Sequence, residues 1–199
     1  VIIKRDVSIK GADNQTWGIG VNSENVFSRF NNAGILAAVN NSSVTVDGNV
    51  YMDVYGNGIA TTAEGSTVTV KGGEITVPTG MNYGYYTLAS YLGTINMNTG
   101  ADGNTPGEET VKLNGDIFAL KDTGNINLAL TTAESYINGA IDNGGNVKLY
   151  LQNGATWYNE ANNTRYYLDS EDTGSLLGSN RTSHVNNFVG ADSLEKAGA

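Results

Sequence analysis

The chain has 199 residues, 39% of them hydrophobic, which is enough for one domain with a buried core or for one segment of a larger protein. Twenty-six glycines and only two prolines, together with abundant Asn and Thr, favour strands and turns over helices. The net charge of −9 disfavours nucleic acid and anionic membranes as partners. The lack of cysteine excludes disulfides and thiolate metal sites.

No apolar run approaches the roughly 20 residues that a membrane-spanning helix needs. The chain begins at Val1 without a charged and apolar leader, so we interpret it as a mature piece or an excised fragment. Residues 1–33 contain two strand-like stretches, Val7 to Ile9 and Trp17 to Val21, that match the rest of the chain only loosely. We predict that residues 1–33 form N-terminal coils or a cap.

The next segment contains an internal repeat. GILAAVNNSSVTVDG, residues 34–48, returns as GIATTAEGSTVTVKG, residues 58–72, so that Val44 corresponds to Val68. Within each copy apolar residues such as Val44 and Val46 alternate with polar ones, which is typical of half-buried strands. A fixed period of this size indicates a solenoid or array.

The repeat continues with drifting spacing. Asn114 to Ile117 returns at the same spacing as Asn138 to Ile141, and Asn125 to Leu130 returns at a slightly shorter one as Asn146 to Leu151. We therefore assign residues 34–157 to a repeat core. Short strands with one apolar face and two open edges cannot fold alone, and they become stable when successive units stack.

We predict an all-β fold, a right-handed parallel β-helix with three short strands and about 24 residues per coil. Stacking would place Val44 on Val68 inside, Thr45 on Thr69 outside, and Asp47 on Lys71. Turns between strands often need a positive φ, which glycine adopts most readily. We expect it at corner glycines: Gly48, Gly72, Gly73, Gly115, Gly139, Gly144 and Gly145.

Two stretches interrupt the pattern. Residues 101–109, which contain Pro106, are predicted to form a protruding loop, and residues 158–181 are polar, acidic and weakly periodic. We assign residues 158–199 to an irregular polar segment and a terminal coil.

Some β-helices degrade polysaccharides, and hydrolysis requires two carboxylates about 5 to 10 Å apart. At the spacing of the first repeat Asp47 meets Lys71, Asp116 meets Ala140 and Asp53 meets Val77, so no acid pair is expected. The acidic run 169–172 lacks the ligand spacing of a calcium loop, and the single histidine, His184, has no partner for metal binding. We predict no catalytic residue, cofactor site or metal site.

Tyrosines offer a better candidate for binding. Tyr51 and Tyr55 are expected to point outward with Asp53 between them, a flat polar-rimmed surface on which a sugar could stack. Tyr83, Tyr85, Tyr86 and Tyr91 form a second cluster. We take Tyr51, Asp53, Tyr55, Tyr83, Tyr85 and Tyr86 as the candidate ligand face. The alternative is that these tyrosines only favour sheet formation.

Residues 138–157, NGAIDNGGNVKLYLQNGATW, combine a Gly-rich turn, an alternating strand and an N-G-A-T-W corner. In this combination they resemble the β-helical stem in passenger domains of bacterial monomeric autotransporters. Residues 135–139 also fit that pattern, and residues 183–188 are similar to a further stem strand. The resemblance implies export to the bacterial cell surface, where the lack of cysteine would ease threading of the unfolded chain.

Members of that family are most often adhesins, so the first hypothesis is a non-enzymatic segment acting in adhesion, aggregation or biofilm formation, as adhesin or stalk. Its partners would be host or bacterial surface glycans or proteins, or other copies of itself. The alternatives are a self-assembling fibre module and a polysaccharide-degrading enzyme.

Overall fold

The computed structural model describes residues 1–11, 17–21, 32–78, 85–142, 144–159, 183 and 185–190. These residues form seventeen strands and no helix. None of the described segments is therefore a helix long and apolar enough to cross a membrane. The strands are β1 (Ile2–Ile3), β2 (Val7–Lys10), β3 (Trp17–Val21), β4 (Ala33–Ala37), β5 (Ser43–Asp53), β6 (Asn57–Thr61), β7 (Ser66–Thr76), β8 (Leu88–Ser90), β9 (Gly93–Met97), β10 (Val111–Asn114), β11 (Ile117–Ala119), β12 (Asn125–Leu130), β13 (Tyr136–Asn138), β14 (Ile141–Asp142), β15 (Asn146–Leu151), β16 (Thr156–Tyr158) and β17 (Asn187–Gly190).

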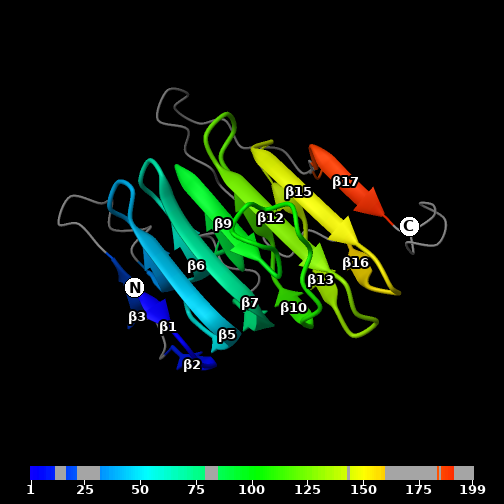
Figure 1. Ribbon diagram of the computed structural model, residues 1–199, viewed down its shortest axis with the longest axis horizontal. Coiled ribbons are helices and arrows are strands. Elements are labelled where there is room, and N and C mark those ends of the chain that lie inside the picture. The colour runs from blue at the N-terminus through cyan, green and yellow to red at the C-terminus, as the bar shows by residue number, and fades with distance from the viewer. Residues whose placement is uncertain are drawn as a thin grey trace.

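The named strands pair in parallel, in one sheet of eleven strands and one of six. Figure 1 shows them side by side, with the colour advancing from blue to red across the sheets. The order of strands in the six-stranded sheet is β3, β4, β6, β8, β11, β14. After β4, each strand of this sheet is separated along the chain from the next by one or two strands of the eleven-stranded sheet. The all-β prediction is confirmed.

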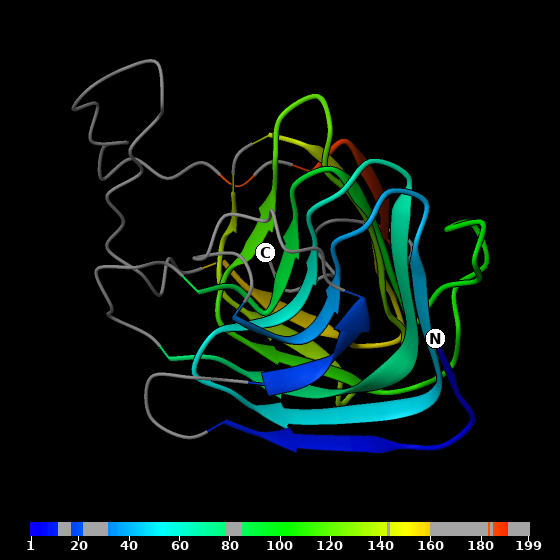
Figure 2. The ribbon, with the colours of Figure 1, turned by 90° about the vertical axis from the view of Figure 1, so that its left-hand side faces the viewer.

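The eleven-stranded sheet has two arms, joined by the two long strands. Arm 1 comprises β1, residues 43–46 of β5, residues 66–70 of β7, β9, β12, β15 and β17. Arm 2 comprises β2, residues 49–53 of β5, residues 72–76 of β7, β10, β13 and β16. The chain passes repeatedly from arm 1 to arm 2 and then to the six-stranded sheet. Figure 2 looks along this stack and shows the strands curled around an interior, an arrangement that fits a β-solenoid.

Most of the predicted register is confirmed. Val44 pairs with Val68, Thr45 with Thr69, and Val46 with Val70. Residues 125–130 pair with residues 146–151 in order, at the shorter spacing of the later repeats. Asn114 and Ile117 likewise lie opposite Asn138 and Ile141.

One register prediction is wrong. Asp53 lies opposite Thr76 and not Val77, because the pairing of β5 with β7 shifts by one residue between Val46 and Asn49. The shift occurs where the chain bends from arm 1 into arm 2, and an extra residue in one strand is the usual device for such a bend. The constant spacing of the repeat therefore describes arm 1 but not arm 2 in these two coils.

The interior is filled by the inward-facing side chains of all three groups of strands. Ile95, Leu113 and Ile117, from arm 1, arm 2 and the six-stranded sheet, are fully buried in one shared cluster. In the two arms the inward-facing residues alternate with polar or more exposed ones, as the sequence pattern predicted. Burial of these apolar side chains is the main favourable term in stacking the coils.

A second apolar cluster lies on the outer surface of the six-stranded sheet. Leu36, Ala60, Ala89 and Phe118 are stacked in register on successive strands, on the side facing away from the shared interior, and all are buried. The Phe118 ring lies 4.8 Å from that of Tyr86 and 4.9 Å from that of Tyr91, between ring centroids. This sheet therefore has apolar residues on both faces, which is why its strands do not alternate in burial.

The prediction for the corner glycines is partly confirmed. Gly73, Gly115 and Gly144 have φ of 119°, 134° and 66°. The other four predicted glycines do not have positive φ, and their small size has a different use. At Gly139, for instance, a Cβ would lie 2.3 Å from the carbonyl oxygen of Gly115, so the two corner backbones could not stack as closely. The prediction of a positive φ is therefore wrong for Gly48, Gly72, Gly139 and Gly145.

The irregular segments fall as follows. Residues 101–109 contain no strand, in agreement with the predicted loop, and in Figure 2 they form part of the green segment outside arm 1. Residues 160–182, most of the predicted polar segment, lie outside the described residues, as do the acidic run 169–172 and His184. At the other end, β1 and β2 pair with β5, and β3 pairs with β4.

We expect Ile95→Ala to lower the free energy of unfolding by about 2 to 4 kcal/mol, because it leaves a cavity in the shared interior. Thr94→Ala is the matched control, since Thr94 precedes Ile95 in β9 and is only half-buried on the opposite face. Urea unfolding followed by circular dichroism measures both. Equal losses in the two variants would contradict the assignment of the interior.

Candidate functional site

The predicted ligand face is divided in the structure. Tyr51 and Asp53 point outward from arm 2, and the Tyr51 side chain is 47% exposed. Between them Met52 points inward, so the alternation of β5 sets their direction. These two residues lie where the sequence placed them.

The other tyrosines are elsewhere. Tyr55 and Tyr85 are half-buried and contact each other edge to face, with ring centroids 5.6 Å apart. Tyr86 is only 3% exposed and packs against Phe118, so it does not offer a surface to a ligand. Tyr83 lies outside the described residues.

The strands of arm 2 add residues that the sequence analysis missed. Tyr51 is paired in series with Glu74, Lys112 and Tyr136, and Asp53 is paired in series with Thr76, Asn114, Asn138 and Tyr158. We call these two outward rows, with Ser8, Lys10 and Thr156, the arm 2 outer surface. Tyr158 is 55% exposed. The sequence could have predicted the pairing of Lys112 with Tyr136, because these two residues are separated by the spacing of the repeat. It could not predict that both align with Tyr51, because the chain between β7 and β10 is longer than the repeat.

A chain of hydrogen bonds runs across the middle of this surface. The Tyr136 hydroxyl donates to Asn114 Oδ1 at 3.2 Å, and Asn114 Nδ2 donates to Thr76 Oγ1 at 3.2 Å. Three strands thus hold the Asn114 amide in one orientation. Polar groups fixed in this way lose little side-chain entropy when a ligand binds.

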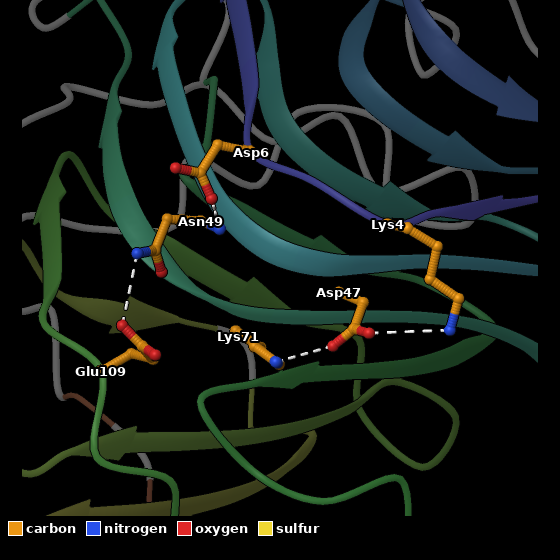
Figure 3. Close-up of polar contacts among 6 residues, drawn as sticks. All are labelled: Lys4, Asp6, Asp47, Asn49, Lys71 and Glu109. Atoms are coloured by element: carbon orange, nitrogen blue, oxygen red, sulfur yellow. Dashed lines mark hydrogen bonds and ion pairs between the residues drawn. The ribbon is translucent and has the colours of Figure 1, made fainter.

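Charged residues line the corner between the two arms, as Figure 3 shows. Asp47 lies between two lysines from neighbouring coils, with Oδ1 at 2.7 Å from Lys71 Nζ and Oδ2 at 3.6 Å from Lys4 Nζ. The hydrogen bond and charge of Lys71 hold the pKa of Asp47 below its ordinary value. Asp47 in turn raises the pKa of Lys71. The predicted stacking of Asp47 on Lys71 is confirmed.

A second polar series runs beside the first. The backbone N–H of Asn49 donates to Asp6 Oδ1 at 2.7 Å, and Asn49 Nδ2 donates to Glu109 Oε2 at 3.3 Å. Both series cross several coils and end in exposed side chains. They bind the coils to one another at the corner, where the register shifts.

The loop of residues 99–110 covers part of the outer surface of arm 1. Asn96 Nδ2 donates to the carbonyl of Ala101, and Lys148 Nζ and the Tyr150 hydroxyl both donate to Asn104, at 2.8 and 2.9 Å. Ala129, which faces outward in β12, is fully buried. This part of arm 1 is therefore occupied by the protein's own chain.

The register shift brings two acids closer than the sequence analysis expected. Asp53 and Glu74 occupy diagonal positions on adjacent strands of the arm 2 outer surface. Both side chains are exposed, whereas a glycosidase acid is usually held in an apolar pocket. In the described ranges no three of His, Asp and Glu are grouped to hold a metal ion.

Comparison with known proteins gives no match: no family model fits the chain, and neither a curated protein nor a solved structure matches it. The resemblance of residues 138–157 to autotransporter passengers stays a prediction.

The Asp47 contacts predict a pH dependence at both extremes. Because the folded pKa of Asp47 is lowered, its stabilising contribution is complete above about pH 4 and is lost as the pH falls through the folded value. Because the folded pKa of Lys71 is raised, the stabilising contribution of Lys71 is complete below about pH 10 and is lost as the pH rises through the folded value. Both effects are small, since exposed pairs are screened by water.

NMR titration of the Asp47 carboxyl carbon tests this. Lys71→Met should return the pKa of Asp47 toward its ordinary value, whereas Lys112→Met, on the arm 2 outer surface, should leave it unchanged. An unaltered Asp47 titration in Lys71→Met would show that the two residues do not pair in solution.

Proposed function

We propose that this chain is part of a right-handed parallel β-helix, with three strands per coil, that acts in adhesion at a bacterial surface. The role is that of an autotransporter passenger segment, as adhesin or as the stalk of one. The parallel stacking, the repeat and the stem-like residues 138–157 support the architecture. The absence of cysteine suits a chain that crosses membranes unfolded.

The observation that carries the adhesive function is the arm 2 outer surface. Of the large apolar or aromatic side chains that are exposed in the described residues, two of five, Tyr51 and Tyr158, lie on it. Around them are amides, hydroxyls and charges spread over six strands. Exposed rings among polar groups suit recognition of an extended partner, and the residues of this surface are exposed or half-buried, whereas a loop covers part of the neighbouring arm.

The first experiment measures attachment. The chain is displayed on a non-adherent bacterium, and settling of the cells and their binding to epithelial monolayers are compared with those of Tyr51→Ala/Tyr158→Ala. We expect the double variant to reduce binding about fivefold or more, since each ring contributes contact area worth on the order of 1 kcal/mol.

Leu92→Ala is the control, because Leu92 is exposed to a similar extent, 42%, but lies after β8 and away from arm 2. Tyr55→Ala is less informative, since the Tyr55 ring packs against Tyr85 and its loss would also disturb a corner. Attachment that is equal in the double variant and the parent chain would refute this role for arm 2.

A structural role in fibres is the second candidate. β1 pairs with β5 on one side only among the described strands, and Ile2 on it is 67% exposed. Such an edge can pair with another chain. Light scattering over a range of concentrations distinguishes the two: growth in particle size that Ile2→Lys abolishes favours assembly, and a constant monomer mass excludes it.

A further inference from the structure

We propose that the arm 2 outer surface binds a neutral, extended, β-1,4-linked polysaccharide that lies along the stack, across the strands. This inference rests on the adhesive function proposed above and names the class of ligand. It follows from the charge of the surface, its direction and the separation of its exposed rings.

The charge of the surface argues for a neutral ligand. Its two rows contain two lysines, Lys10 and Lys112, and two acids, Asp53 and Glu74, so their formal charges cancel. The chain as a whole carries a charge of −9. An anionic polysaccharide would be repelled by the whole and would find no excess of cations here.

The long axis of the surface runs across the strands, and this argues for an extended ligand chain. Equivalent side chains on successive strands are about 4.8 Å apart. An extended β-1,4-linked chain of hexoses advances by nearly the same distance per sugar, so consecutive sugars can contact consecutive strands. Its apolar ring faces can stack on tyrosine, and its equatorial hydroxyls can bond to groups such as the Asn114 amide.

The separation of the rings sets the length of the ligand. Tyr51 lies on β5 and Tyr158 on β16, four strands further along arm 2, so they are about 19 Å apart along the stack. Between them lie Glu74, Lys112 and the hydrogen-bonded series Thr76, Asn114 and Tyr136. A disaccharide can contact only one of the two tyrosine rings, whereas a chain of five or six sugars can contact both. The surface therefore predicts affinity that rises with chain length.

Isothermal titration calorimetry with cello-oligosaccharides of two to six sugars tests this on the whole chain. Cellohexaose should bind at least about fivefold more tightly than cellobiose, because only the longer chain gains the second ring contact. Tyr51→Ala and Tyr158→Ala should each weaken cellohexaose binding about fivefold, and Leu92→Ala should not. Maltohexaose, whose α-linkages curl the chain, and anionic polygalacturonate should both bind more weakly than cellohexaose.

The proposal is overturned if cellohexaose does not bind, if it binds no better than cellobiose, or if the tyrosine variants bind it like the parent chain. Because the substituted side chains are exposed, circular dichroism and the urea midpoint should be unchanged, which separates lost binding from lost folding. The cell-attachment assay distinguishes the two proposals: attachment that still depends on Tyr51 and Tyr158, without cellohexaose binding, preserves the adhesive function and rejects the polysaccharide.

Discussion

Parallel pairing between successive coils is the constraint on which the rest of the structure depends. Each strand has two edges of main-chain donors and acceptors, and within the described stack the equivalent strands of the neighbouring coils satisfy them. The register of the strands is therefore kept while the length of chain between them varies. Asn96 and Asn127 stack at a separation of 31 residues, and Asn125 and Asn146 at 21. The surplus chain in the longer coil leaves at a corner, as the loop of residues 99–110.

Pairing is less regular at the corners, where buried polar side chains add to the backbone hydrogen bonds between coils, such as the one from the N–H of Gly139 to the carbonyl of Tyr158. Asn98 donates to the carbonyls of Glu109 and Ala129 and to Thr131 Oγ1, and it accepts from the N–H of Glu109. Asp116 accepts from the N–H of Ala140 in the next coil. Each such group would be costly to bury alone, so its bonds fix both the corner and the coil above it.

Repeats in the sequence were sufficient to predict the pairing of Val44 with Val68 and of residues 125–130 with 146–151, because alternation and equal spacing both survive there. They failed at the corner near Gly48, where a one-residue shift leaves no trace in composition. They also failed for the outer cluster around Phe118, since alternation assumes that only one face of a strand is buried. In both cases a contact remote in the sequence decided the local structure.

The candidate surface was harder to predict than the fold for the same reason. Tyr51 could be placed on an outward face from β5 alone. Tyr158 joins it only through four successive strand pairings, one of which crosses 38 residues between Thr76 and Asn114. Tyr86, by contrast, was included in the candidate ligand face because it clusters with other tyrosines in the sequence, yet it is buried and packs against Phe118.

The same alternation also separates stability from recognition on arm 2. Val50 and Met52 fill the interior, while Tyr51 and Asp53, between and beside them, face the solvent. A substitution at an outward position changes the surface without creating a cavity, and one at an inward position does the reverse. On arm 1 the loop of residues 99–110 covers part of the equivalent surface, and on the six-stranded sheet an apolar cluster occupies it. Arm 2 is thus the part of the described stack where outward residues are freest to match a partner.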